Sequence, residues 1–320
     1  MNRPIIRLYG LVAVLFALLV AFTSRWTVFE ASSLRESPLN KRRVLREERT
    51  PRGAIVAADG TVLARSVLGG EGVYRRTYPT GELFATPVGY DYLAPELGST
   101  GIERYRDEAL SGHGETNLQG VLDQLQGKEP QGEKVITTLV PAAQRAALAA
   151  LGDHRGAVVA LEPASGAVTA MVSTPTYDPN ALASQGYREA LSASGHSLDN
   201  RATQYGYAPG STFKIVTATA AIDTGEYTPE STVSGPDGLL VSGLPLHNDN
   251  DASFGPVTLT YALAHSINTV YAQVAERVGK ATLGRYMERF GFDRKPQLDF
   301  PAGEMSATTT QSRGSALPSS

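Results

Sequence analysis

The sequence Ala208-Pro-Gly-Ser-Thr-Phe-Lys214 is the most informative run in this 320-residue chain. It places the hydroxyl of Ser211 and the amine of Lys214 three residues apart at the predicted start of a helix, where they share one face. A serine needs a nearby base to become a nucleophile, and a lysine is such a base when burial lowers its pKa. The helix N-terminus adds N–H groups that stabilise an oxyanion. In the alternative interpretation Ser211 only caps the helix.

A second motif, Ser266-Ile-Asn268, follows 55 residues after Ser211. Because a serine and an asparagine two residues apart diverge on a helix, we expect a loop or a helix junction here. Ser266 is then placed to relay a proton between Lys214 and a leaving amine. Asn268 can accept from Lys214 and donate its amide N–H to a substrate carbonyl. Either side chain can also cap the helix expected over residues 270–278.

The two motifs together resemble those of penicillin-binding proteins and serine β-lactamases, whose third motif is Lys-Thr-Gly. Other runs narrow the resemblance to the class B, high-molecular-weight penicillin-binding proteins. Those similar to the transpeptidase domain are Val135-Ile-Thr-Thr-Leu139 with Gln144, residues 156–171, and Leu198-Asp-Asn-Arg-Ala202. Residues 49–64 and 98–105 resemble the pedestal of class B members. The resemblance covers about residues 45–302, and the Arg-rich, Ala-rich composition is typical of the actinobacterial branch.

The resemblance implies an α+β fold built from four segments. Residues 1–29 form a cytoplasmic stub and a transmembrane anchor, and residues 30–130 form a linker and a small mixed pedestal domain of the dimerisation type. Residues 131–305 form an incomplete penicillin-binding transpeptidase domain, with an antiparallel sheet and helices on both faces. Residues 306–320 are polar and contain one large apolar residue, which predicts a disordered tail.

Local patterns predict several elements of the second half. Pro141 begins a short helix that Gly152 ends. Residues 156–162 and 167–173 flank a Pro-Ala-Ser-Gly turn and predict a β-hairpin. Residues 211–224 are apolar along much of their length, which predicts a buried helix, and residues 281–290 predict an amphipathic one.

The third motif of the family is missing from this sequence. None of the six lysines is followed by Thr-Gly or Ser-Gly. We therefore interpret the chain as truncated or frameshifted before that motif, with a natural short form as the alternative. Since removing one oxyanion donor costs roughly 10²- to 10³-fold in rate, we expect this chain to be weakly active or inactive.

Residues 8–24 are apolar or small throughout, and about 17 residues is near the lower limit for a membrane span. A cleaved signal peptide is the alternative, but no clean small-residue cleavage site precedes Arg25. Basic residues are more numerous after the span than before it, so the positive-inside rule favours a cytoplasmic domain. The resemblance instead implies a single-pass protein of the cell membrane whose catalytic domain is extracytoplasmic.

Composition excludes several other classes. The formal net charge of −3 at pH 7 gives no basic footprint for nucleic acid. There is no cysteine, hence no disulfide framework and no thiolate chemistry. The five histidines show no metal-ligand spacing, so each is interpreted as a surface or structural residue. We expect no metal, no cofactor and no nucleic-acid partner.

The resemblance implies a serine D,D-transpeptidase of peptidoglycan crosslinking and cell division that works through an acyl-enzyme. Its catalytic residues are Ser211 as nucleophile, Lys214 as base, Ser266 as relay and Asn268 as positioning group. The implied partners are stem peptides ending in D-Ala-D-Ala, β-lactams as covalent inhibitors, and wall-synthesis or division proteins. The alternatives are a non-catalytic scaffold of the wall-synthesis machinery, a β-lactam sensor and a β-lactamase.

Overall fold

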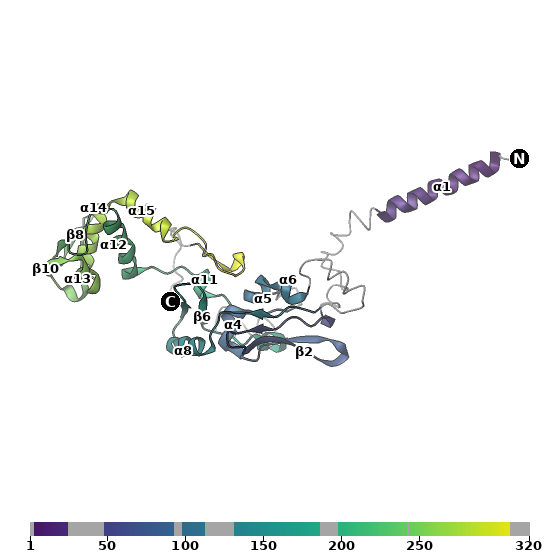
Figure 1. The fold of residues 1–320 in the computed structure, drawn as a ribbon, viewed down its shortest axis with the longest axis horizontal. Coiled ribbons are helices and arrows are strands. Elements are labelled where there is room, and N and C mark those ends of the chain that lie inside the picture. The colour runs from purple at the N-terminus through teal and green to yellow at the C-terminus, as the bar shows by residue number, and fades with distance from the viewer. Residues whose placement is uncertain are drawn as a thin grey trace. The chain divides into compact units, whose positions relative to one another are not determined.

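The computed structural model describes residues 3–24, 48–92, 98–112, 131–185, 198–241 and 243–307 (Figure 1). The chain divides into two compact units, Met1–Leu198 and Asp199–Ser320. Helices are interspersed with short strands that are mostly paired antiparallel, and the fold is α+β as predicted. The unit boundary falls inside the predicted transpeptidase domain of residues 131–305, whose limits stay predictions. Most of the predicted linker and of the predicted tail lies outside the described residues.

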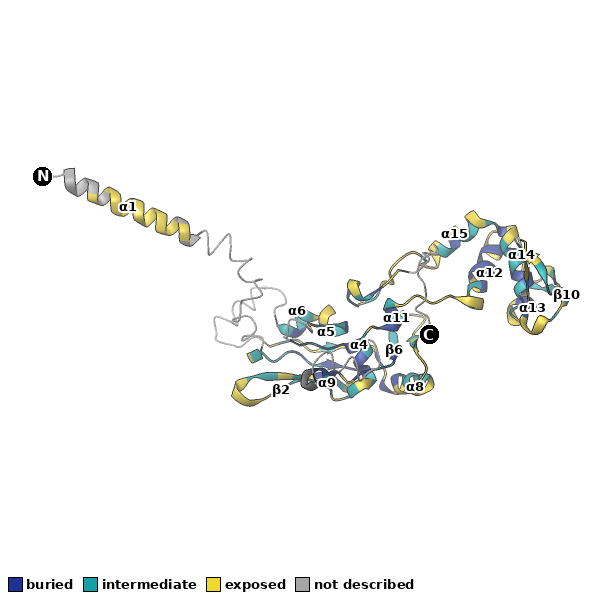
Figure 2. Ribbon diagram, turned by 180° about the vertical axis from the view of Figure 1, so that it is seen from behind, coloured by how far each residue is buried: buried dark blue, intermediate teal, exposed yellow. Residues whose placement is uncertain are grey.

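The N-terminal helix α1 (Arg3–Ser24) exposes its apolar side chains, among them Leu8, Leu15 and Phe16, each more than half exposed (Figure 2). Within the described parts of the chain, no helix combines the length and the apolar character that a bilayer crossing needs. The membrane anchor stays a prediction.

A small mixed sheet organises the first unit. Its strand order is β3-β2-β1-β4, with β1 antiparallel to β2 and parallel to β4. The strands are β1 (Ile55–Val56), β2 (Val62–Leu68), β3 (Tyr74–Thr77) and β4 (Val135–Ile136). Gly53, just before β1, has to be glycine, because a Cβ there would lie 1.8 Å from the carbonyl oxygen of Glu133. This close approach brings β4 alongside β1.

Short helices pack their apolar side chains against this sheet. They are η3 (Gly81–Phe84), α4 (Ala85–Val88), α5 (Gly101–Tyr105) and α6 (Asp107–Ser111). The turn η2 (Gly70–Gly72) is exposed and buries no side chain. Ile55, Leu63, Phe84 and Leu110 are at most 1% exposed and form one core. Apolar burial of this kind is the main favourable term in folding.

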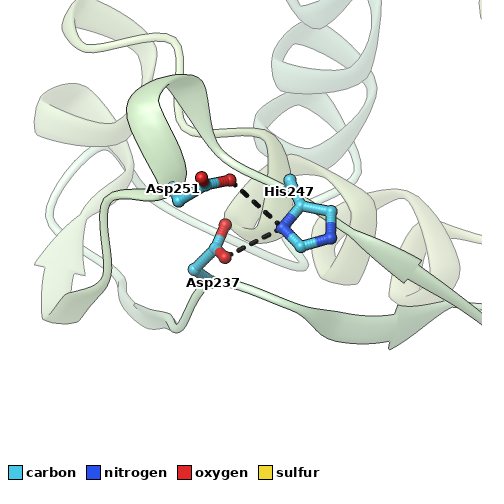
Figure 3. A group of neighbouring side chains, drawn as sticks. All are labelled: Asp237, His247 and Asp251. Atoms are coloured by element: carbon cyan, nitrogen blue, oxygen red, sulfur yellow. Dashed lines mark hydrogen bonds and ion pairs between the residues drawn. The ribbon is translucent and has the colours of Figure 1, made fainter.

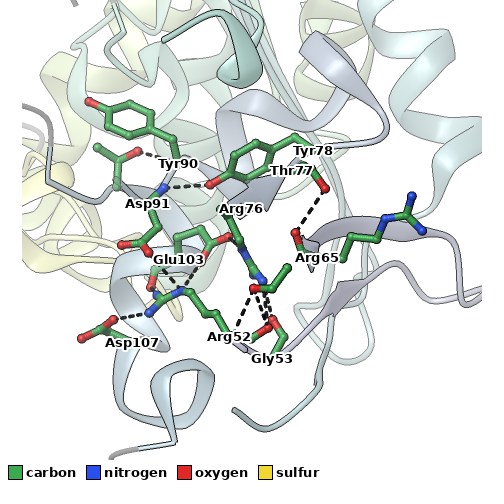
Figure 4. Close-up of polar contacts among 12 residues, drawn as sticks. Arg52, Gly53, Arg65, Arg76, Thr77, Tyr78, Tyr90, Asp91, Glu103 and Asp107 are labelled. Carbon is green, nitrogen blue, oxygen red and sulfur yellow. Dashed lines mark hydrogen bonds and ion pairs between the residues drawn. The ribbon is translucent and has the colours of Figure 1, made fainter. Parts of the chain in front are cut away.

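A charged cluster lies beside that core (Figure 4). The Glu103 side chain is fully buried and accepts from Arg52 Nε at 2.8 Å and from Arg76 Nε at 2.6 Å. Arg52 also donates to Asp107 at 2.6 Å and lies 3.4 Å from Asp91. Burial raises the pKa of Asp91 to about 6, outweighing the opposite effect of Arg52. The cluster ties the chain before β1 to β3 and α5.

A helix and a hairpin complete the first unit. Helix α8 (Pro141–Leu151) begins and ends where the sequence predicted, and it packs against β5 (Gly156–Leu161) and β6 (Val168–Thr174). The two strands pair antiparallel, so the predicted hairpin is confirmed. The buried Gln144 amide bonds to the backbone of Met171 and Leu83. Helix α9 (Pro179–Gln185) follows.

The second unit packs helices against two short β-ribbons. Its helices are α11 (Arg201–Gln204), η4 (Gly210–Thr212), α12 (Phe213–Asp223), η5 (Asp249–Asp251), α13 (Leu259–Ala264), α14 (Asn268–Val278), α15 (Lys280–Arg289) and η6 (Ala302–Glu304). The antiparallel ribbons are β7 (Thr232–Gly235) with β10 (Phe254–Thr258), and β8 (Leu239–Val241) with β9 (Leu244–Leu246).

Helix α12 is the centre of this unit's core. Val216, Ala220 and Ala221 are buried against Val270 and Val274 of α14. The prediction of a buried helix over residues 211–224 is correct for one face only. Ile215 and Ile222 are 54% and 43% exposed, because they lie on the side of α12 away from this core. The amphipathic helix expected near residue 281 is confirmed as α15.

Candidate active site

Ser211 and Lys214 lie where the turn η4 runs into α12. Gly210 has φ +54°, a left-handed conformation that favours glycine, and it directs the chain into the turn. Ser211 is exposed, whereas Lys214 is buried with 9% exposure. The residue at the N-cap of α12 is Thr212, and no side chain caps this helix end. Ser211 therefore does not serve as the cap, and its hydroxyl lies 3.2 Å from Lys214 Nζ.

Ser266 and Asn268 lie at the junction of α13 and α14, as the sequence predicted. Ser266 adopts a left-handed conformation with φ +53°, which is uncommon for a residue with a Cβ. This conformation brings both its backbone oxygen and its hydroxyl to Lys214 Nζ, at 2.7 and 2.9 Å. Ile267 occupies the N-cap of α14 without a side-chain bond. The capping alternative for Ser266 and Asn268 is therefore not what the structure shows.

Lys214 Nζ faces more acceptors than it has protons. It lies within 3.2 Å of four oxygens, from Ser211, Asn268 and twice from Ser266, and the shortest distance is 2.6 Å to Asn268 Oδ1. An ammonium group donates three hydrogen bonds. The contact with Ser211 is the longest of the four. When the amine is neutral, Ser211 becomes the donor of this hydrogen bond and Lys214 Nζ the acceptor. Burial lowers the pKa of Lys214, which favours that neutral form.

The two serine hydroxyls are also in contact. Ser266 Oγ donates to Ser211 Oγ at 3.0 Å and accepts from Lys214 Nζ. Ser211 thus keeps its own proton for the amine. The three side chains form a closed path along which a proton can pass in either direction.

The amide of Asn268 has a fixed orientation. Its Nδ2 donates to the backbone carbonyl of His247 at 2.9 Å, and a carbonyl cannot donate in return. The Oδ1 atom consequently faces Lys214, and the second Nδ2 proton remains for another acceptor. Neither His247 nor its neighbour Asn248 was identified from the sequence. His247 directly precedes, and Asn248 begins, a polar Asn-Asp-Asn-Asp run that is typical of a turn.

One group of side chains in the described residues has atoms close enough to hold a metal ion: Asp237, His247 and Asp251 (Figure 3). His247 Nδ1 lies 2.9 Å from an Asp237 oxygen and 3.4 Å from an Asp251 oxygen. The hydrogen bond to Asp237 raises the pKa of His247. A protonated imidazole satisfies this geometry by itself, and the group is joined to the Lys214 network through the backbone carbonyl of His247, which accepts from Asn268.

Family models cover most of the chain. The model described as the penicillin binding protein transpeptidase domain matches residues 156–319, just over half of the sequence. The chain belongs to the penicillin-binding protein family. A second model, the penicillin binding protein A dimerisation domain, matches residues 52–135. That range contains the sheet and the charged cluster of the first unit.

Curated penicillin-binding relatives are similar over most of this chain. The peptidoglycan D,D-transpeptidase PbpA of Mycolicibacterium smegmatis is 37% identical in an alignment of length 314 that covers 92% of this chain and 63% of the relative. PbpA of Mycobacterium tuberculosis is 36% identical over 93% of this chain and 64% of its own length. MrdA of Escherichia coli is 31% identical over 72% of this chain and 41% of the relative. The chain spans less than two thirds of the relatives' length.

Solved penicillin-binding proteins share the fold. Penicillin-binding protein A from M. tuberculosis in its penicillin G acyl-enzyme complex has a TM-score of 0.72 and 34% identity, covering 81% of this chain and 63% of that one. The D,D-transpeptidase domain of a peptidoglycan glycosyltransferase from Eggerthella lenta has a TM-score of 0.69 and 33% identity, with coverages of 82% and 57%.

Proposed function

We propose that this site carries out D,D-transpeptidation of peptidoglycan through an acyl-enzyme on Ser211. The observation that carries the proposal is the position of Lys214 Nζ, which is within hydrogen-bond distance of Ser211, Ser266 and Asn268 at once. A buried amine in contact with an exposed hydroxyl is the pairing that an activated serine needs. The names of the relatives, peptidoglycan D,D-transpeptidases, support the same reaction.

Acylation begins with neutral Lys214. Its amine takes the proton of Ser211 while Ser211 Oγ bonds to the carbonyl carbon between two D-alanines of a stem peptide. The C–N bond then breaks, and the departing D-alanine amine receives the proton from Lys214 through the hydroxyl of Ser266. The products are an ester on Ser211, free D-alanine and a neutral lysine. General acid–base catalysis of this kind typically contributes 10²- to 10⁴-fold.

The turn at Ser211 supplies one oxyanion donor. Among the described residues, the backbone N–H of Ser211 donates to no other backbone group, and it lies at the start of η4 and α12. A preorganised N–H in this position stabilises the negative charge that develops on the substrate carbonyl oxygen. The remaining Nδ2 proton of Asn268 is placed to hold a carbonyl group of the substrate.

Transfer reverses the proton path. An amine from a neighbouring stem peptide attacks the ester carbon, and its proton passes through Lys214 to Ser211 Oγ as the ester C–O bond breaks. A β-lactam enters the same route but leaves the serine acylated. The acyl-enzyme complexes of penicillin-binding protein A with penicillin G and imipenem support this part of the proposal.

Labelling with a fluorescent penicillin tests the proposal. Because the third motif is missing, we expect weak covalent label on this chain, located at Ser211 by peptide mass spectrometry and absent from Ser211→Ala. Ser234→Ala is the matched control, because Ser234 is an exposed serine on β7 of the same unit. Label that persists in Ser211→Ala, or no label above that variant in the unmodified chain, would refute the assignment.

The remaining expectations are proposals as well. We propose that α1 anchors the chain in the cell membrane with the active site outside, a role that its exposed apolar side chains support. We also propose that β5 and β6 belong to an antiparallel sheet covered by helices on both faces, of which α8 is one. We further propose that the predicted pedestal of residues 30–130 docks wall-synthesis or division proteins. Carbonate extraction of membranes, with and without residues 1–29, tests the anchor.

A further inference from the structure

Asn248 is a buried polar residue whose side chain has a complete set of partners. It is 6% exposed. Its Nδ2 donates to the carbonyls of Gly235, at 3.2 Å, and Ala252, at 2.8 Å. Its Oδ1 accepts from the backbone N–H of Thr269 at 3.0 Å and from the Thr269 hydroxyl at 3.2 Å. One amide therefore joins three separate segments of the second unit.

Thr269 links Asn248 to the active site, because it is the residue next to Asn268. Thr269 is fully buried and follows Asn268, whose amide accepts from Lys214. His247, directly before Asn248, supplies the carbonyl that orients the Asn268 amide. Two consecutive residues of one segment thus hold two consecutive residues at the start of α14. Within the described structure, neither His247 nor Asn248 forms a hydrogen bond with Lys214 or Ser211.

The segment that carries Asn248 is itself fixed. The backbone N–H of Asn248 donates to Asp237 Oδ1 at 2.8 Å, and the other carboxylate oxygen of Asp237 pairs with His247. Asn250 and Asp251 adopt left-handed conformations that turn the chain back toward β10. The carbonyl of His247 therefore has one position relative to α14.

We propose that Asn248 is a positioning residue for the reaction of Ser211. It holds the first turn of α14 against the segment before η5, so that Asn268 keeps its oxygen on Lys214 and its nitrogen on the carbonyl of His247. This inference deepens the proposed function and rests on it for its effect on rate. A displacement of about 1 Å in a positioned group costs on the order of 10²-fold in rate.

The test combines two readouts on the full 320-residue chain in mild detergent. The first is the rate constant of acylation by a fluorescent penicillin. The second is the side-chain amide NMR signal of Asn268 in ¹⁵N-asparagine-labelled protein, assigned by its loss in Asn268→Asp. The second readout does not depend on acylation. A chain that fails to acylate would refute the proposed function, and the amide signal would still show whether Asn248 positions Asn268.

The single variants are Asn248→Ala, Thr269→Val and Asn268→Ala. One double variant combines Asn248→Ala with Asn268→Ala. Thr269→Val has the same shape and removes only the hydroxyl donor to Asn248, so it tests the role should Asn248→Ala not fold. Gln144→Ala is the matched control, because Gln144 is also a buried amide with three backbone bonds, in the first unit. It should lose stability without changing the site.

We expect Asn248→Ala to slow acylation on the order of 10- to 100-fold and the double variant to be little slower than Asn268→Ala alone, since the two residues act in series. The Asn268 amide should exchange faster in Asn248→Ala and Thr269→Val, and remain unchanged in Gln144→Ala. An Asn268 signal that is unchanged in both Asn248→Ala and Thr269→Val overturns the proposal. So do additive losses of rate in the double variant.

Discussion

Replacing Glu103 by alanine should weaken the first unit more than any exposed substitution in the chain. Glu103 has no exposed surface and lies between Arg52 and Arg76, whose side chains are 11% and 5% exposed. In the variant, Arg52 keeps Asp107 at 2.6 Å as a partner. Arg76 keeps only the backbone carbonyls of Gly53 and residue 52, at 2.7 and 3.2 Å.

The cost follows from the charge left behind. Removing one partner of a buried ion pair costs about 3 to 5 kcal/mol, because the remaining charge is desolvated and uncompensated. Arg76 Nη2 is already buried without a hydrogen-bond partner, so the guanidinium has little left to offset that loss. Glu103→Gln keeps the shape and one acceptor but removes the same charge and places an amide donor against one guanidinium, so it should cost a similar amount.

Urea titration followed by hydrogen-exchange mass spectrometry measures the effect unit by unit. Peptides from residues 52–111 should reach exchange at a lower urea concentration in Glu103→Ala, whereas peptides from α12 and α14 should not change. Glu226→Ala serves as the exposed control, since Glu226 and Arg277 are 43% and 71% exposed and such pairs contribute about 0 to 1 kcal/mol. Equal losses in the two variants would show that Glu103 does not neutralise buried charge.

Three further predictions concern the site and the pH dependence. Ser266→Gly and Ser266→Ala should both slow acylation, because both remove the relay hydroxyl. Glycine relieves the strain of the left-handed backbone, whereas alanine keeps the Cβ that Ser266 already has, so Ser266→Gly should melt at a higher temperature than Ser266→Ala; acylation rates and melting temperatures of both separate the two effects. The acylation rate should rise with pH, because the neutral amine of Lys214 is the reacting form. Burial lowers the pKa of Lys214, so the midpoint of this rise should lie below the ordinary lysine value of 10.5. A midpoint at or above 10.5 contradicts the prediction. The pKa of Asp91 is raised from 3.8 to about 6, so its contribution to the stability of the first unit should be largest below pH 4. Up to about 3 kcal/mol of that contribution should be lost as pH rises through 6. In urea titrations, Asp91→Asn should remove this pH dependence.

Local sequence signals were enough to predict the elements whose first and last residues are marked by proline, glycine or a turn. Helix α8 begins at Pro141 and ends before Gly152, because proline fixes a helical φ at the first turn and glycine accommodates the exit. The β5–β6 hairpin follows from a turn between two apolar runs in the same way. The exposed face of α12 was not predictable, because its residues are as apolar as those in the core. Which apolar face becomes buried depends on α14 and α15, some 50 residues away along the chain.

The same distinction explains which site residues the sequence revealed. Ser211 and Lys214 are one helical turn apart, so their spacing alone places a nucleophile beside an amine. Asn268 was recognisable as half of a second motif, but the direction of its amide is set by a carbonyl at residue 247. Asn248 begins an Asn-Asp-Asn-Asp run that indicates only a turn, and its proposed role depends on hydrogen bonds to residues 13 and 21 positions away. A hydroxyl and an amine can be predicted from spacing because the helix fixes their geometry. The residues that keep the base in position are found only where distant segments meet, so variants at Asn248 test the active site more sharply than the motifs themselves do.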